Sequence, residues 1–251
     1  MASLLLSFQF LTILPIKVKD FNERRIADSA VYFPIVGLCL GLLLVAVDAL
    51  LTLLNFPAFS TNIILVVFLI LITGGMHLDG LADSSDAFLS AKPKNEMLQI
   101  MRDSHIGVMG VLSLICVILL KIGLLSSINT FLKWNALLLV CVLSRWTAVL
   151  SIFLFPYARQ DGKAKLFIEG MNLKIFILSS IIVIICAAFI WQVRGLILLL
   201  IVTAFVYGSG KLICRKIDGI TGDTLGATIE LSEIVTLFFM FVIQGADLWS
   251  V

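Results

Sequence analysis

Long apolar runs separated by short polar segments dominate this chain of 251 residues. Each run approaches or exceeds the roughly 20 residues that a helix needs to cross the hydrocarbon core of a bilayer. Backbone amides in lipid must be paired within their own segment, so the runs predict helices. The pattern therefore predicts an all-α, polytopic integral membrane protein with about seven spans, at residues 31–54, 60–76, 106–127, 135–156, 174–193, 196–213 and 229–247.

The first apolar stretch, residues 2–14, is too short to span a bilayer and ends at Pro15. We expect it to form an interfacial or re-entrant helix. The composition agrees with lipid as the main solvent, since 61% of the residues are hydrophobic and only 14% are charged. No repeat or long polar connection marks a second unit, so residues 1–251 are expected to form a single transmembrane domain. Nothing in the sequence points to nucleic acid as a partner.

Basic residues gather in one set of loops. Such residues are retained on the cytoplasmic side when a membrane protein inserts. Their distribution over seven spans predicts a cytoplasmic N-terminus, cytoplasmic charged loops and an external C-terminus. The basic set comprises Lys17, Lys19, Arg24, Arg25, Lys92, Lys94, Arg102, Arg159, Lys163, Lys165, Lys174, Lys211, Arg215 and Lys216, whereas the opposite loops hold only Lys133 and Arg194. These residues can simply follow the insertion rule, or they can also attract a phosphorylated substrate.

Residues 74–88, GGMHLDGLADSSDAF, carry the strongest candidate chemistry. Asp79, Asp83 and Asp86 are spaced four and three residues apart, which places them on one face of a helix. Carboxylates on one face repel each other unless a cation lies among them, and Mg²⁺ prefers oxygen ligands that it shares with substrate phosphates. A solvated helix start is the alternative. We expect the three aspartates to bind Mg²⁺ and to act in catalysis, with His77 as a nearby polar or proton-accepting group.

A second charged segment, residues 101–110, lies where the chain re-enters the membrane on the same predicted face. Asp103 is a candidate for completing a metal site. Arg102 can bind phosphate through its fork of N–H groups, and His105 is a candidate substrate contact. Charged neighbours of this kind are also ordinary features of a membrane surface, so both interpretations stay open.

A third segment, TGDTLGATIELSE at residues 221–233, begins another predicted span. Asp223 and Glu230 are seven residues apart and so share one helical face, where both are candidate metal ligands. A carboxylate at the depth of Glu230 is costly in a bilayer and is usually functional. Gly222 and Thr224 are candidate substrate contacts. The alternative is a helix contact between small residues with a solvated Asp223.

Two further features concern space and charge inside the predicted bundle. Glycines at Gly74 and Gly75 permit a break in the helix or a close backbone approach. Arg145 lies well inside a predicted span, where an unpaired guanidinium is expensive. Its candidate partners are Asp223, Glu230 or a substrate phosphate, and a purely structural ion pair is an equal alternative.

Taken together, these motifs resemble those of the cobalamin synthase family, also called adenosylcobinamide-GDP ribazoletransferase. The resemblance runs nearly end to end. It rests on FQFLTILP (8–15), YFPIVG (32–37), the acidic block at 74–88, RDSHIG (102–107), LSRW (143–146) and TGDTLGATIE (221–230). The family frequently has arginine at the positions of Ile13 and His105. If either arginine binds diphosphate, Arg102, His105 or a loop lysine must fill that role here.

The resemblance implies a multi-pass enzyme of the prokaryotic cytoplasmic (inner) membrane. Such an enzyme transfers the cobinamide-phosphate moiety of adenosylcobinamide-GDP to α-ribazole or its 5′-phosphate, releases GMP and requires Mg²⁺. On this hypothesis Asp79, Asp83 and Asp86, with Asp223 or Asp103, hold the metal at the diphosphate. His77 or a carboxylate takes the proton of the attacking hydroxyl. The resemblance leaves the preferred acceptor open, and a homo-oligomer or a biosynthetic complex remains an option.

Two other functions compete with this interpretation. A phosphotransferase of the CDP-alcohol type also uses aspartates at the membrane edge with Mg²⁺, but its usual DG…AR…G…D…D spacing is absent here. A transporter also accommodates several spans and buried charges. Transport predicts charges along a path through the bilayer, whereas the charges of this chain gather toward one predicted face.

Overall fold

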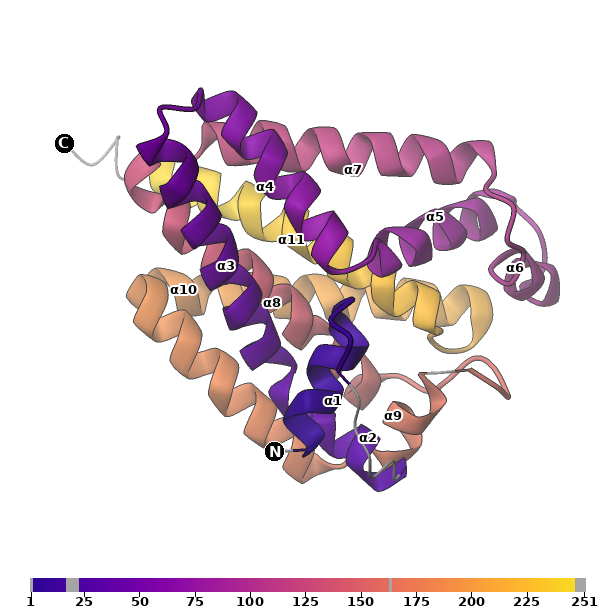
Figure 1. The fold of residues 1–251 in the computed structure, drawn as a ribbon. Helices are drawn as coiled ribbons and strands as arrows, with labels where there is room; N and C mark the ends of the chain where they lie inside the picture. The colour runs from indigo at the N-terminus through magenta and orange to yellow at the C-terminus, as the bar shows by residue number, and fades with distance from the viewer. Residues whose placement is uncertain (1, 17–22, 163, 247–251) are drawn as a thin grey trace.

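The computed structural model describes residues 2–16, 23–162 and 164–246, which form a bundle of helices (Figure 1). Lys17, Lys19, Lys163 and the predicted span end at Asp247 lie outside these residues. Within the described ranges, the only bridge of β type is an isolated pairing of Tyr157 with Ile220. The helices are α1 (Ala2–Leu11), α2 (Glu23–Ser29), η1 (Ala30–Tyr32), α3 (Phe33–Leu53), α4 (Ala58–Ile72), α5 (Met76–Leu89), α6 (Lys94–Ile100), α7 (Val108–Ser127), η2 (Thr130–Leu132), α8 (Lys133–Leu154), α9 (Lys165–Gly170), α10 (Leu173–Ile217) and α11 (Gly222–Ala246).

The predicted all-α membrane architecture is confirmed. Among the described residues, five helical segments are long and apolar enough to cross a membrane: Arg24–Leu53, Val108–Ser127, Thr130–Leu154, Leu173–Ile217 and Gly222–Gly245. A sixth span arises if α4 and α5 are counted together. The predicted number of seven is therefore not confirmed. The short helix predicted at the N-terminus is present as α1, which spans only 10 residues.

Helix α10 accounts for part of the difference, because its 45 residues cover both predicted spans at 174–193 and 196–213. Trp191 and Gln192 interrupt it with non-helical backbone angles, and Gln192 has φ 49°. A Cβ atom added to Gly195 would lie 2.1 Å from the carbonyl oxygen of Ala187, so the chain folds back sharply there. Figure 1 shows this change of direction within α10.

The second difference lies between α4 and α5, which are bent by 88° relative to each other. Gly74 and Gly75 both adopt positive φ, 65° and 67°, a region that glycine enters without a steric penalty. Of the two options that the sequence left open at these glycines, the structure shows the helix break. Helix α5 carries three aspartates and turns away from the apolar α4, so we treat it as lying outside the five spans.

Helix α8 forms the centre of the bundle and packs against α3, α10 and α11. Most of its side chains are buried, as expected for a helix surrounded by protein rather than lipid. Helices α5 and α7 pack against α11 on another side, and α1, α2 and α9 pack together at one end (Figure 1). This arrangement brings the beginnings of α5 and α11 close to the loop that follows α8.

Candidate functional site

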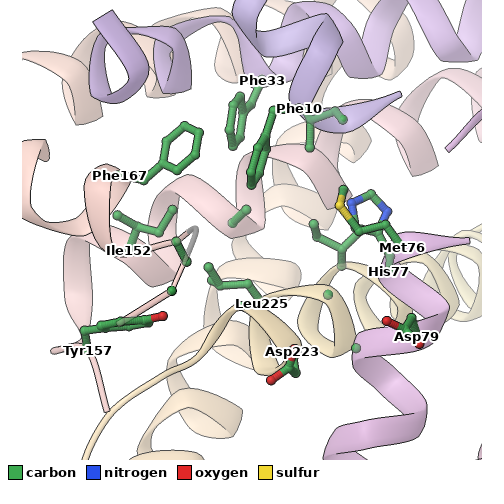
Figure 2. A pocket seen from close by; sticks show the side chains of 18 of the residues that line it. Phe10, Phe33, Met76, His77, Asp79, Ile152, Tyr157, Phe167, Asp223 and Leu225 are labelled. Carbon is green, nitrogen blue, oxygen red and sulfur yellow. The ribbon is translucent and has the colours of Figure 1, made fainter. Parts of the chain in front are cut away.

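A cavity of about 310 Å³ opens where α1, α5, α8, α9 and α11 meet. Figure 2 shows that its wall has two kinds of side chain, with aromatic rings on one side and carboxylates on the other. The polar part is lined by His77, Asp79, Tyr157, Arg159 and Asp223, and the apolar part includes Phe10, Phe33, Ile152, Phe167 and Leu225. The cavity therefore suits a ligand that combines charge with an apolar group.

Two aspartates from separate sequence motifs reach this cavity. Asp79 lies in the first turn of α5 and Asp223 in the first turn of α11. A Cβ atom added to Gly80 would lie 2.7 Å from the carbonyl oxygen of Asp223, so only glycine permits this close approach of the two helices. The acidic block and the TGDTLGA block thus contribute one carboxylate each to a single site.

The start of α11 is fixed by two threonines. The backbone N–H of Thr221 donates to Thr224 Oγ1 at 2.8 Å, and the N–H of Thr224 donates to Thr221 Oγ1 at 3.2 Å. These reciprocal hydrogen bonds satisfy amides at the helix start that have no partner within the helix. Gly222, a predicted substrate contact, lines the cavity, whereas Thr224 is buried and holds the helix start in place.

The other two aspartates of α5 differ from Asp79. Partial burial, followed by the negative charges of Asp79, Asp223 and Asp86, raises the pKa of Asp83 to about 7. Both carboxylate oxygens of Asp86 are used at the start of α7, where they accept hydrogen bonds from the N–H groups of Gly107 at 2.7 Å and Gly110 at 2.8 Å. Asp83 therefore lies in the field of the other carboxylates, while Asp86 holds α5 against α7.

These carboxylates offer hard oxygen donors of the type that Mg²⁺ prefers. In the part of the chain that the structure describes, no group of three or more His, Cys, Asp or Glu side chains is arranged to hold a metal ion by itself. Mg²⁺ is usually held by one or two carboxylates together with waters and substrate phosphates. Asp79 and Asp223, with Asp83 beside them, fit a site of this shared kind.

His77 is buried beside this pair and is only 3% exposed. Neither of its ring nitrogens has a hydrogen-bond partner among the described residues, although the side chain lines the cavity. An unpaired buried polar atom costs free energy that a bound ligand can recover. In Figure 2 the imidazole of His77 and the carboxylate of Asp79 point away from each other, although both line the cavity.

Arg159 is a site residue that the sequence motifs did not single out. Its Nη2 lies 2.7 Å from Asp223 Oδ2, and its buried Nε has no hydrogen-bond partner within the described ranges. A guanidinium with a free N–H group in a cavity is suited to a phosphate oxygen. In the sequence analysis Arg159 appeared only among the basic loop residues. Local residue spacing does not indicate that the fold places it beside Asp223.

The second charged segment lies at the surface near this cavity rather than in its wall. Arg102, Asp103 and His105 are exposed and do not line it. His105 Nδ1 lies 2.6 Å from Asp103 Oδ1, which also accepts a hydrogen bond from the backbone N–H of His105 at 3.0 Å. These side-chain and backbone hydrogen bonds lower the pKa of Asp103. Its carboxylate is thus paired locally in this arrangement.

A separate buried charge network joins α7, α8 and α11. Lys121 Nζ lies 2.5 Å from carboxylate oxygens of both Glu230 and Glu233, and Arg145 pairs with Glu233. Glu233 is therefore the carboxylate that pairs with Arg145, in place of the expected Asp223 or Glu230. It lies almost one turn beyond Glu230 on α11 and faces α8. Glu230 forms an ion pair with Lys121 and does not line the cavity.

Comparisons with known proteins agree with the motifs. The sequence model of the cobalamin-5-phosphate synthase family matches residues 3–241. A protein of Caldanaerobacter subterraneus subsp. tengcongensis named adenosylcobinamide-GDP ribazoletransferase is 37% identical over 96% of this chain and 98% of its own length. Proteins of the same name from Fusobacterium nucleatum subsp. nucleatum and Clostridioides difficile are 34% and 35% identical, each over 97% of this chain and 98% of the relative. No solved structure shows a significant match. The chain therefore belongs to the cobalamin-5-phosphate synthase family, a family of transferases.

Proposed function

We propose that this protein is an adenosylcobinamide-GDP ribazoletransferase. It transfers the cobinamide-phosphate moiety of adenosylcobinamide-GDP to α-ribazole or α-ribazole 5′-phosphate and releases GMP. The observation that carries the proposal is the meeting of Asp79 and Asp223 in one cavity with Arg159. A diphosphate needs both cationic and metal-binding groups around it, and this polar wall supplies them.

The diphosphate of the donor binds at the polar wall of the cavity. Arg159 donates its free Nε–H to a phosphate oxygen, while Asp223 keeps the guanidinium in place. Asp79 and Asp223 are the residues that would hold Mg²⁺ together with the diphosphate, and Asp83 lies in the field of both carboxylates. When bound, Mg²⁺ neutralises negative charge on the transferring phosphoryl group and on the departing phosphate.

The reaction is a substitution at the phosphorus that bears the cobinamide. A ribose hydroxyl oxygen of the acceptor forms a new bond to this phosphorus, and the bond to the bridging oxygen of GMP breaks. The hydroxyl proton passes to a base, for which His77 is the candidate, because it lines the same cavity with both ring nitrogens unpaired among the described residues. Most of the rate enhancement comes from positioning and charge stabilisation, as in other phosphoryl transfers.

The site belongs on the cytoplasmic side of the prokaryotic cytoplasmic membrane. Lys92 and Lys94 follow the end of α5, and Lys216 lies at the end of α10, shortly before α11 begins. Their enrichment on this side is the distribution that the insertion rule gives to cytoplasmic loops. A cytoplasmic site also gives direct access to a charged nucleotide substrate, which cannot cross lipid unaided.

The proposal is tested by mixing the purified protein with adenosylcobinamide-GDP and α-ribazole 5′-phosphate and identifying the corrinoid product by mass spectrometry. The expected product is adenosylcobalamin 5′-phosphate. A parallel reaction with unphosphorylated α-ribazole determines which acceptor has the higher kcat/KM. Release of cobinamide phosphate without the nucleoside attached would mean hydrolysis and would contradict transfer.

A further inference from the structure

Four charged side chains are buried in the bundle but do not line the cavity. They are Lys121 on α7, Arg145 on α8, and Glu230 and Glu233 on α11, each at most 5% exposed. Replacing a whole buried ion pair by apolar side chains is often neutral for stability, and the best-attested role of buried charges is to fix how helices align. This buried charge network is therefore a candidate for aligning α11, the helix that carries Asp223 in its first turn.

The contact between α5 and α11 beside the cavity is made through glycines. A Cβ atom added to Gly226 would lie 3.1 Å from the carbonyl oxygen of His77. Gly222 precedes Gly226 by four residues, about one helical turn. If α11 moved by one turn, Gly222 would replace Gly226 opposite His77, again without a side chain, and Asp223 would shift by about 6 Å. The glycine contact by itself thus permits two axial registers of α11.

Other contacts between these helices discriminate weakly between the two registers. An apolar layer fills the space between α5, α7 and α11, and its buried members are Leu78, Leu81, Val117 and Ala227. Apolar contacts are non-directional and repack readily. At the far end, the Gln244 side chain accepts from the N–H of Asn129 at 2.9 Å and donates to the carbonyl oxygen of Ser127 at 3.0 Å. These hydrogen bonds are exposed, so water can replace them.

The buried charge network is satisfied in one register only. Lys121 Nζ lies 2.5 Å from carboxylate oxygens of both Glu230 and Glu233. Arg145 pairs with Glu233 from α8. A slip of one turn would move both carboxylates about 6 Å from these cations and leave buried charges unpaired, which is costly.

The network also connects α11 back to the helix that carries Asp79. Asp86 on α5 accepts hydrogen bonds from two backbone amides at the start of α7. Further along α7, Lys121 holds α11, whose first turn returns Asp223 to α5. The three helices pack against one another in pairs (Figure 1). They form a closed set in which the alignment of α11 determines where Asp223 lies relative to Asp79.

We propose that the residues of the buried charge network are positioning residues, which fix the axial register of α11 and thereby place Asp223 opposite Asp79 for shared binding of a divalent cation. The role of the cation rests on the proposed function, whereas the register is a property of the chain without substrate. Glu230 lies seven residues beyond Asp223, about 10 Å along the helix, so the network acts through α11 and not by contact with the substrate.

The test uses two double variants that each remove one positive and one negative charge, so the network stays neutral. They are Lys121→Met/Glu230→Gln and Arg145→Met/Glu233→Gln. The matched control is Lys133→Met/Asp48→Asn, because this pair is also buried and 2.5 Å apart but joins α8 to α3 without α11. Gln244→Ala removes the exposed contact and is the second control.

The register is measured without substrate, as the distance between α7 and α11. Spin labels at Leu119→Cys and Phe241→Cys, both exposed positions, are read by pulsed electron paramagnetic resonance after the five native cysteines are replaced by alanine. The intact network should give a single distance. Each double variant should add a second population, displaced by up to about 6 Å, whereas both controls should keep the single distance.

The functional measurement is the Mg²⁺ concentration that gives half-maximal release of GMP. We expect it to rise about tenfold or more in both double variants, the usual effect of losing groups that orient metal ligands, and the rate to recover in part at high Mg²⁺. Both controls should change it less than about twofold. A purely structural loss lowers the amount of active protein but leaves this concentration unchanged.

A single unchanged distance in both double variants would overturn the assignment, as would an unchanged Mg²⁺ requirement. A second distance in Lys133→Met/Asp48→Asn would also overturn it, because loss of any buried pair would then loosen the bundle. Absence of GMP release by the wild type contradicts the proposed function. The distance measurement needs no substrate, so it decides the register separately.

Discussion

Arg159 Nη2 lies 2.7 Å from Asp223 Oδ2, and this pair joins the loop after α8 to the first turn of α11. The two charges lie in a cavity that also receives Asp79 from α5. Arginine and carboxylates side by side bind a diphosphate in complementary ways, since one contacts the oxygens directly and the others do so through a cation. The arrangement brings together the acidic block at residues 74–88 and the segment at residues 221–233, which are separated by more than half of the chain.

Replacing Asp79 or Asp83 by Asn should lower kcat at least about 100-fold, because loss of the charge removes cation binding where the phosphoryl group is transferred. Release of GMP measures the change. Asp218→Asn is the matched control, since Asp218 is exposed, does not line the cavity and pairs with Lys94 at 2.9 Å. Near-normal turnover in both site variants would rule out this role for the aspartates.

Replacing Arg159 by Ala should raise the KM for adenosylcobinamide-GDP roughly tenfold or more, because the guanidinium supplies a charge-assisted hydrogen bond to the diphosphate. Arg159→Lys should recover only part of the loss, since lysine lacks the planar fork. Initial rates at varied donor concentration provide the measurement, with the exposed Arg215→Ala as control. An unchanged KM for the donor in Arg159→Ala would rule out the proposed contact between Arg159 and the diphosphate.

Asp86 should behave differently from Asp79 in a stability assay. Its carboxylate caps the start of α7 through the amides of Gly107 and Gly110. Asp86→Ala should therefore destabilise the fold by about 1 kcal/mol, the usual cost of a lost helix cap. Thermal unfolding in detergent should show a lower Tm for Asp86→Ala than for Asp79→Ala. Equal midpoints for the two variants would argue against the capping role.

The buried network at Lys121 should be essential for stability. Lys121→Met leaves Glu230 and Glu233 with too little positive charge nearby, and breaking a buried pair of this kind typically costs about 3–5 kcal/mol. The double variant Lys121→Met/Glu230→Gln should be more stable than Lys121→Met alone, because it removes one of the uncompensated charges. If Lys121→Met unfolds at the wild-type temperature, the network does not stabilise the fold.

The sequence predicted the helical membrane fold because apolar length is a local property that the composition of each run reveals. It also marked Gly74 and Gly75, which adopt positive φ, as a place for a helix break or a close backbone approach. The number of spans was not predictable in the same way. The predicted boundary between the spans at 174–193 and 196–213 coincides with the fold-back at Trp191 and Gln192. Local composition does not reveal that α5 turns away from α4.

The candidate site was predicted in part. Helical spacing pointed to Asp79, Asp83 and Asp86, and the third segment pointed to Asp223; of these, Asp79 and Asp223 line the cavity. Spacing could not reveal that Asp86 caps α7 or that Arg159 enters the same cavity, because both contacts join distant parts of the chain. The role of Glu233 as partner of Arg145 likewise depends on how α11 faces α8.

The most direct test of the account is the release of GMP by purified protein in liposomes, supplied with adenosylcobinamide-GDP and α-ribazole 5′-phosphate. Wild type and Asp79→Asn are compared, each with Mg²⁺ and with EDTA. We predict GMP release only by the wild type, and only when both the acceptor and Mg²⁺ are present. Equal release in EDTA, or full activity of Asp79→Asn, would contradict a shared metal site at Asp79 and Asp223.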